Sequence, residues 1–318
     1  MPNAYAFAFL ILACLFYSSS SQAHHIGSDE NFSVNLGELE DTVKQYGPES
    51  ALNEIEKDYI SGDISSDKCH NAAHLIGKIS AGTYGLSVAA ARGNHICRSG
   101  YFHGVFESLG YNGIYDKNSI ASLCSGKELQ KEGDRLQCLH GLGHGLEVAH
   151  DYNTEAAVES CILFSGEYAE ACAGGIYMEA MKPGHQNQVP ADSNFENVNE
   201  FCGKKFANVC SRYSGYSLLR RSGNDLEKAF RDCDTSAEKQ ECQYGFGAII
   251  TRTLDFDPKN VYKTCANDGL NENCFLGAAS EYGNSREIGK GFEFCMLELN
   301  LNGINCAATI ALRVSKYI

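Results

Sequence analysis

The chain has 318 residues and a formal net charge of −14, with 26 Lys and Arg against 40 Asp and Glu. Nucleic acids and anionic membranes are bound through clustered basic residues that release counterions. The sequence holds no such Lys/Arg cluster, so both classes of partner are excluded. Its length suffices for one large core or for an elongated array of repeats.

Residues 1–23 have the pattern of a signal peptide. They contain no Asp, Glu, Lys or Arg, and the apolar run Ala4–Tyr17 is followed by serines and by the small-residue site Ser21-Gln22-Ala23. The run is shorter than the ~20 residues of a spanning helix. We therefore expect a secreted or otherwise extracytoplasmic mature chain without a membrane span, and a retained signal-anchor is the alternative.

Cysteine usage agrees with export. The sequence has 15 cysteines, and loss of Cys14 with the signal peptide leaves 14, an even number that permits complete pairing in an oxidising compartment. No two cysteines have the spacing Cys-x-x-Cys, which excludes the usual zinc-ribbon and thiol-redox sites. Residues 24–66, including the amphipathic stretch Glu49–Ile60, are predicted to form an N-terminal helical cap.

A repeat of cysteines follows the cap. Seven cysteines each begin a stretch rich in small residues, at intervals of 41, 34, 38, 32, 32 and 32 residues. This is the length of helical-hairpin repeats. Because one hairpin cannot bury its apolar face alone, the sequence predicts an all-α protein, an α/α solenoid of stacked hairpins. The seven are Cys97, Cys138, Cys172, Cys210, Cys242, Cys274 and Cys306.

Five of the seven have a glycine three residues later, which indicates close approach of a neighbouring helix. Each of the last six is preceded by a cysteine that ends a helix-patterned segment. Pairing within a hairpin brings the two Cα atoms to the ~4.4–6.8 Å that a disulfide requires. Cys69 and Cys97 are left over and are predicted to pair with each other, with a free or reshuffled pair as the alternative. The other predicted pairs are Cys124 with Cys138, Cys161 with Cys172, Cys202 with Cys210, Cys233 with Cys242, Cys265 with Cys274, and Cys295 with Cys306.

Residues 67–190 form a histidine-rich set of repeats. Three successive predicted helices carry two metal-donor side chains at the spacing i, i+4, which places both on one helix face. The pairs recur at about the repeat period, so stacked helices present them to one region. The paired donors are His70 and His74, His103 and Glu107, and His140 and His144.

This donor set predicts a transition-metal site for zinc, iron or copper. Six residues after the helix-opening cysteine, three successive repeats have His103, His144 and Met178. The later repeats have Tyr216, Ala248, Ser280 and Leu312 at the same position. Met178 and Glu179 are weaker candidate ligands, as is His24, the N-terminal residue after cleavage at Ala23. Structural hydrogen bonding between helices and a polar ligand pocket are the alternatives.

The sequence leaves open whether the protein is an enzyme. It contains no Gly-x-Ser-x-Gly elbow, no Walker loop and no His-Glu-x-x-His motif. If the metal site is catalytic, Glu107 and Glu147 are the candidate proton-transfer groups.

Residues 191–318 are predicted to form helical hairpins that are each closed by a disulfide. Asp225-Leu-Glu-Lys-Ala-Phe opens one of them, and Cys233/Cys242 and Cys265/Cys274 each enclose eight residues. With the glycine after the second cysteine, this half resembles the Sel-like repeats, especially the Helicobacter cysteine-rich proteins. The resemblance implies a right-handed superhelix of helix pairs and a role in binding a protein or peptide partner in its groove. Such an extracytoplasmic interaction solenoid without metal is therefore the alternative to the metal site.

Overall fold

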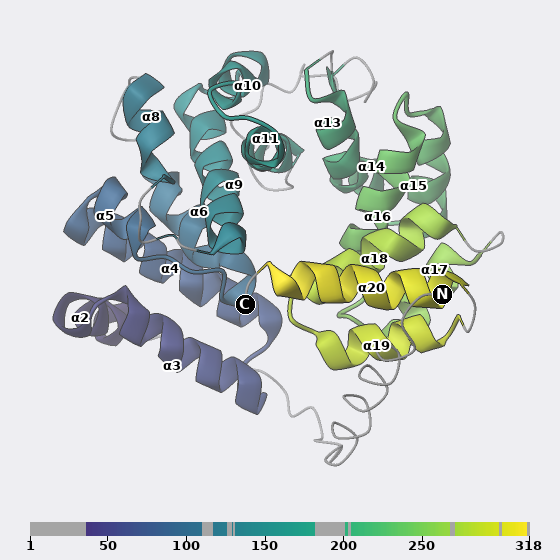
Figure 1. Ribbon diagram of the computed structural model, residues 1–318, viewed down its shortest axis with the longest axis horizontal. Coiled ribbons are helices and arrows are strands. Elements are labelled where there is room, and N and C mark those ends of the chain that lie inside the picture. The colour runs from purple at the N-terminus through teal and green to yellow at the C-terminus, as the bar shows by residue number, and fades with distance from the viewer. Residues whose placement is uncertain are drawn as a thin grey trace, which may run out of the picture. The chain divides into compact units, whose positions relative to one another are not determined.

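The computed structural model describes residues 36–109, 117–125, 129, 131–181, 201–202, 205–267, 271–298 and 301–316. Within the compact unit Asn35–Ile318, every described regular element is a helix (Figure 1). None of the described helices combines the length and apolar character needed to cross a membrane. The predicted signal peptide and His24 lie outside the described residues.

The elements are α2 Leu36–Tyr46, α3 Pro48–Ser61, α4 Ser66–Tyr84, α5 Leu86–Ala91, η1 Cys97–Ser99, α6 Gly100–Glu107, α8 Lys117–Leu123, α9 Glu132–Ala149, α10 Thr154–Cys161, α11 Glu167–Met181, α13 Ala207–Tyr213, α14 Gly215–Arg221, α15 Leu226–Asp232, η2 Cys233–Thr235, α16 Lys239–Thr253, α17 Pro258–Cys265, α18 Glu272–Asn284, α19 Ile288–Met296 and α20 Leu301–Ser315.

Local sequence signals set several helix starts. Helix α17 begins with Pro258 after Asp257, whose carboxylate accepts a hydrogen bond from the Asn260 amide. Asp225 caps α15 in the same way through the Lys228 amide. An N-cap carboxylate satisfies an amide that the helix leaves unpaired, and proline lacks the amide that would be unpaired at the first position.

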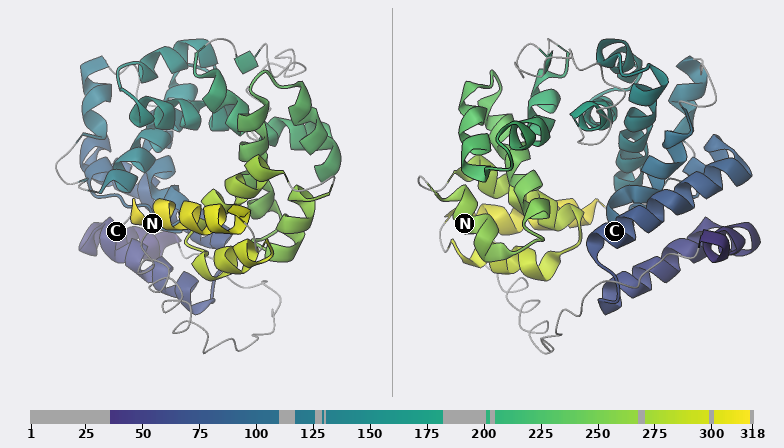
Figure 2. Two further views of the ribbon diagram at one scale, coloured as in Figure 1. Left: turned by 45° about the vertical axis from the view of Figure 1, so that its right-hand side comes forward. Right: turned by 180° about the vertical axis from the view of Figure 1, so that it is seen from behind.

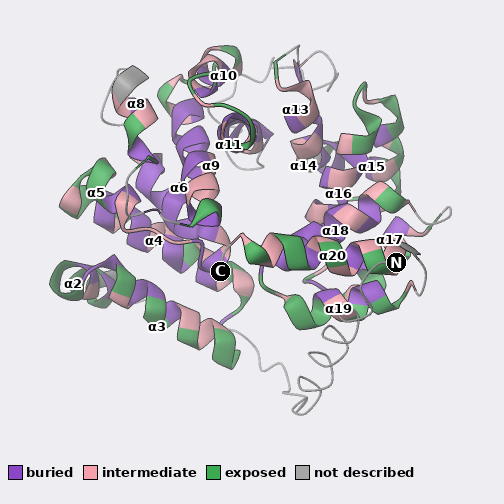
Figure 3. Cartoon of the chain, in the orientation of Figure 1, coloured by how far each residue is buried: buried purple, intermediate pink, exposed green. Residues whose placement is uncertain are grey.

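Helices of one series pack on one another in chain order. Their apolar faces are buried between neighbours, as Figure 3 shows for α6, α9 and α11. The first helix of a hairpin packs against this series, as α10 does on α11 and α19 does on α20. The series is α4, α6, α9, α11, α13, α16, α18 and α20, with a contact between each helix and the next.

All seven predicted disulfides form. Their Cα–Cα distances are 5.3 to 5.7 Å. Six join the two helices of one hairpin, and the seventh joins Cys69 in the first turn of α4 to Cys97 in η1. Cys69 and Cys97 therefore pair with each other rather than staying free. The staples hold the hairpin loops closed, and each restricts the unfolded chain by loop closure.

The Cys-x-x-Gly glycines lie where neighbouring helices touch. A Cβ built on Gly175 would lie 1.9 Å from the His140 carbonyl oxygen, and one on Gly245 would lie 1.6 Å from that of Arg212. A Cβ built on Gly277 would likewise lie 1.8 Å from the Tyr244 carbonyl oxygen. Since real Cβ atoms do not approach oxygen so closely, only glycine permits these helix–helix distances. The sequence prediction of close helix approach is confirmed at these positions.

Two glycines in α4 give a matched test of this packing. Gly77 faces α6, where a Cβ would lie 2.0 Å from the Tyr101 carbonyl oxygen, whereas a Cβ on exposed Gly82 meets no atom within 4 Å. We expect Gly77→Ala to lower the free energy of unfolding by about 1–3 kcal/mol through overpacking. Gly82→Ala should raise it by up to about 1 kcal/mol because alanine is the better helix former. Urea unfolding measures both, and equal effects of the two substitutions would contradict the packing argument.

Elements from the first half of the chain also contact elements near its C-terminal end (Figure 2). The Tyr59 hydroxyl of α3 donates a hydrogen bond of 2.5 Å to Glu287, just before α19. Beside it, Arg286 forms an ion pair of 2.8 Å with Glu56. On α9, the Gly133 amide donates a hydrogen bond to the carbonyl oxygen of Lys316, which follows α20. Residues from α4 through α20 also line one common cavity.

Candidate metal centre

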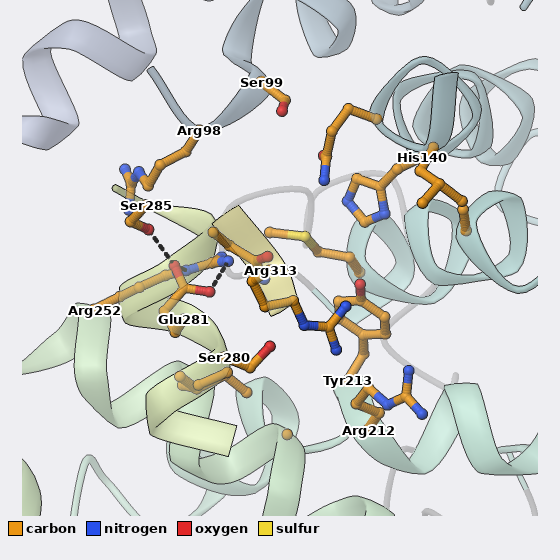
Figure 4. Close-up of a pocket in the computed structure, with 18 of the residues that line it drawn as sticks. Arg98, Ser99, His140, Arg212, Tyr213, Arg252, Ser280, Glu281, Ser285 and Arg313 are labelled. Carbon is orange, nitrogen blue, oxygen red and sulfur yellow. Dashed lines mark hydrogen bonds and ion pairs between the residues drawn. The ribbon is translucent and has the colours of Figure 1, made fainter. Parts of the chain in front are cut away.

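The cavity has a volume of about 640 Å³, within the range of small-molecule sites. Side chains from successive helices of the series reach it, as Figure 4 shows for Ser99, His140, Tyr213, Ser280 and Arg313. The position six residues after the helix-opening cysteine faces the cavity in five repeats, through His103, Met178, Tyr216, Ala248 and Ser280. Leu312, at the same position of the last repeat, is 63% exposed and does not line it.

The five predicted metal-binding histidines come together at one side of this cavity. His70 and His74 lie on α4, His103 on α6, and His140 and His144 on α9. They form two overlapping groups of three, in each of which the ligand nitrogens all lie within 4.8 Å of one another. The first triad is His70, His74 and His103, and the second triad is His103, His140 and His144. The predicted convergence of these histidines is therefore present in the structure, and their role as metal ligands stays a prediction.

Glycine contacts explain why the histidines approach so closely. A Cβ on Gly104 of α6 would lie 1.8 Å from the carbonyl oxygen of His74, and one on Gly100 would lie 2.4 Å from that of His70. The helix turns that carry the histidines are therefore the turns at which the backbones nearly touch. Imidazole rings from facing helices meet as a result, with centroids 5.1 Å apart for His74 and His103 and 4.4 Å for His103 and His144.

Fixed acceptors orient the first triad. The Nδ1 atoms of His70 and His74 lie 2.9 Å from the Cys97 carbonyl oxygen and 2.8 Å from Glu107 Oε1. Since both partners accept, each Nδ1 carries the proton and each Nε2 presents a lone pair. His74 Nε2 in turn lies 3.2 Å from His103 Nδ1. Glu107, a predicted ligand, lies outside the two histidine triads and contacts His74.

The second triad has the same construction. His144 Nδ1 donates a hydrogen bond of 2.5 Å to Glu179 Oε2, and both side chains are almost fully buried. This leaves His144 Nε2 facing His140 Nε2 at 3.2 Å. Two ring nitrogens at this distance either share one proton or face one common ion. Glu179, a weaker candidate ligand from the sequence, thus contacts His144 on the side away from His140.

Glu147 lies on α9 one turn beyond His144 and is 0% exposed. Its Oε1 accepts a hydrogen bond of 2.6 Å from the Thr154 hydroxyl, whereas Oε2 has no hydrogen-bond partner among the described residues. Burial, together with the nearby Glu179 carboxylate, raises the pKa of Glu147 to about 7 against the hydrogen bond from Thr154. Among the described residues Glu147 makes no hydrogen bond to either triad, so its predicted role in proton transfer stays a prediction.

The remaining histidines lie elsewhere. His95 is buried and its Nδ1 donates to Asp134 at 2.7 Å, while His150 caps α9 near Ser160. His24, His25 and His185 lie outside the described residues. These positions leave the five clustered rings as the candidate donors, and Met178 is the sulfur donor that lines the same cavity.

The wall formed by α16 and α18 carries residues that the sequence did not single out. Arg252 forms a two-pronged ion pair with Glu281 at 2.6 and 2.8 Å and donates to the Tyr216 hydroxyl (Figure 4). Although burial opposes the charge, the Glu281 carboxylate raises the pKa of the Arg252 guanidinium. Ser285 donates to Glu281 from the next turn. This wall is a fixed polar surface whose cation is already neutralised by its partner.

Part of this wall comes from a position that recurs in the repeats. The residue two positions after the helix-opening cysteine lines the cavity as Ser99, His140, Arg212 and Tyr244. The histidine pattern does not point to Arg212, which this register places on the cavity wall. Arg212 pairs with Glu241 at 2.7 Å.

Comparisons of the chain with protein-family models, with curated proteins and with solved structures give no match. The disulfide-stapled helical hairpins are consistent with the resemblance to the Sel-like repeats, and no family match supports membership of that family.

Proposed function

We propose that this protein binds a transition-metal ion through its histidine triads. The observation that carries the proposal is the convergence of five imidazoles from three helices into two groups with nitrogens within 4.8 Å. Two nitrogens bound tetrahedrally to one ion at ~2.1 Å lie about 3.4 Å apart. The pairs His74/His103 and His140/His144 have nitrogens 3.2 Å apart, close to that value.

The hydrogen bonds behind the ligands support a metal site over simple helix packing. In metal sites, a ligating histidine usually donates its other ring N–H to a carboxylate or a backbone carbonyl, which fixes the ring and makes it more basic. Glu107 holds His74 in this way, Glu179 holds His144, and the Cys97 carbonyl holds His70. We assign these two carboxylates to orienting the ligands.

The donor set favours zinc or copper. Non-haem iron sites combine two histidines with a ligating carboxylate, whereas each triad here consists of imidazoles and the neighbouring carboxylates contact Nδ1 atoms. Imidazole nitrogens suit zinc and copper, and Met178 adds a soft donor to the cavity wall. A three-nitrogen set leaves a coordination position for water or a small ligand.

His70, His103 and His140 line the cavity, so this position would open towards it. We also propose that the stacked hairpins form a solenoid whose inner helices line the cavity, in an extracytoplasmic protein that carries its seven disulfides in an oxidising compartment. In this arrangement the metal is reached from the cavity rather than from the outer surface.

The test is metal retention. Untagged protein purified without chelator is analysed for metal per chain by mass spectrometry, before and after dialysis against zinc or copper. We expect at least one equivalent in the parent chain. His74→Ala combined with His140→Ala removes one nitrogen from each triad at half-buried positions, so it should abolish retention while the helical circular dichroism spectrum stays nearly unchanged.

His150→Ala provides the matched control, because His150 is also half-buried but lies outside both triads. It should retain metal at the parent level. A parent chain that holds no metal and takes up neither zinc nor copper would overturn the proposal and favour the interaction solenoid, whose cavity binds a peptide or another polar ligand.

A further inference from the structure

His103 belongs to both triads. It lies on α6 between α4, which carries His70 and His74, and α9, which carries His140 and His144. Its ring is 4% exposed, and its centroid lies 5.3 and 5.1 Å from the two rings of α4 and 5.5 and 4.4 Å from the two of α9. The central imidazole is therefore in ring contact with the other four.

One ion cannot use all five histidines. Two nitrogens bound to one ion at ~2.1 Å are at most about 4.2 Å apart. Among the described residues, the nitrogens that meet within 4.8 Å form two sets of three rather than one set of five. Occupation of both sets therefore requires two ions, and His103 has to serve both.

A histidine can serve two ions once its ring proton is released to solvent, because the two nitrogens of the resulting imidazolate each present a lone pair on a different edge of the ring. His103 Nδ1 faces the first triad, 3.2 Å from His74 Nε2, and Nε2 is the ring nitrogen that remains for the second. We propose that His103 bridges two transition-metal ions, with Nδ1 bound to an ion held by His70 and His74 and Nε2 bound to an ion held by His140 and His144. This inference rests on the proposed function.

The surroundings of the other rings agree with a bridge at this position. His70, His74 and His144 each have Nδ1 occupied by a backbone carbonyl or a carboxylate, so each offers Nε2 alone. In contrast, His103 has its Nδ1 directed into a triad. Glu107 and Glu179, one beside each triad, supply negative charge next to the two cations.

Copper titration with paramagnetic resonance tests the bridge. Metal-free protein is titrated with Cu²⁺ alone, and bound copper and the spin signal are followed together. We expect two Cu²⁺ per chain and a decrease of the isolated Cu²⁺ signal as the second equivalent binds, because two Cu²⁺ ions joined by one imidazole couple their spins. His150→Ala should behave as the parent chain.

Single substitutions on either side separate the two ions. His70→Ala should bind one Cu²⁺ at the second triad, and His140→Ala should bind one at the first, each with an isolated, uncoupled signal. Both residues are half-buried and line the cavity, so their removal disturbs packing less than removal of buried His103.

The outcomes distinguish this inference from the proposed function. Absence of bound copper would overturn both. One equivalent in the parent chain, or two equivalents with undiminished isolated signals, would overturn the bridge and leave a mononuclear or uncoupled metal site in place. Two coupled equivalents that persist in His70→Ala or in His140→Ala would also contradict the assignment of His103.

Discussion

Replacement of Cys69 and Cys97 by alanine should lower the free energy of unfolding by about 3.6 kcal/mol on the chain-entropy estimate for a disulfide. These cysteines are 28 residues apart, the widest separation among the seven disulfides. The longer the loop that a disulfide closes, the more entropy it removes from the unfolded chain. Denaturant unfolding under non-reducing conditions, with the other six disulfides intact, measures the loss.

The same variant should also weaken metal binding at the first triad. Cys69 precedes His70 in α4, and the Cys97 carbonyl oxygen accepts the hydrogen bond from His70 Nδ1. Without the disulfide, η1 is no longer tied to α4, so the acceptor that orients His70 is free to move. We expect lower metal occupancy in addition to lower stability.

Cys265→Ala with Cys274→Ala is the matched control. This disulfide joins α17 to α18 across a separation of 9 residues, away from the histidines. Its removal should cost about 2.7 kcal/mol by the same estimate and leave metal binding unchanged. Equal stability losses for the two variants, with metal retained in both, would contradict the argument.

The cysteine spacing was sufficient to predict the hairpins and all seven pairings. Short loops leave each cysteine with one nearby partner, and the last pair, Cys69 with Cys97, follows by elimination once the other twelve are assigned. The glycine three residues after the cysteine predicted helix contact for an equally local reason, since a missing Cβ matters where another backbone approaches, as at Gly175.

The histidine positions were predictable because helix periodicity and repeat period are both sequence properties. His70 and His74 share a helix face, and a repeat of similar length brings His103 and His140 beside them. The roles of the carboxylates were not predictable. Glu107 and Glu179 are each one helical turn or more from a ligand in sequence, and only the interhelical geometry shows that they contact Nδ1 atoms.

The ion pair on the polar wall could also not be predicted from the sequence. Arg252 and Glu281 lie 29 residues apart on α16 and α18, and either residue alone has the appearance of a solvent-exposed charge. The contact between Tyr59 on α3 and Glu287 before α19 spans 228 residues. No local pattern encodes it, because it depends on how all the elements between the two residues pack.

Glu147→Gln should stabilise the protein at pH 8 and have little effect near pH 4. Burial raises the pKa of Glu147 to about 7, from the model-peptide value of 4.5 expected in the unfolded chain. Between these values the folded state holds a proton that the unfolded state releases, so the stability contributed by this group is fully present below pH 4.5 and is lost as pH rises through about 7. The difference between these two pKa values corresponds to about 3 kcal/mol of folding stability.

Glutamine at this position keeps an oxygen for the Thr154 hydroxyl and does not titrate. The free energy of unfolding of the variant should therefore exceed that of the parent chain by a margin that grows from pH 5 to pH 8 and approaches about 3 kcal/mol. Denaturant unfolding of metal-free protein at several pH values measures this margin without a contribution from metal release. Glu293→Gln, which removes an exposed carboxylate from α19, is the control.

A margin that is constant with pH, or that shrinks as pH rises, would show that Glu147 is ionised in the folded protein at neutral pH. In metal-loaded protein, by contrast, an ionised Glu147 would have a compensating cation at the second triad. Repeating the titration on metal-loaded protein addresses that case, because a cation bound at the second triad favours the carboxylate form and should flatten the dependence on pH. The pH dependence of stability that Glu147 contributes thus reports whether the neighbouring histidines bind a metal ion.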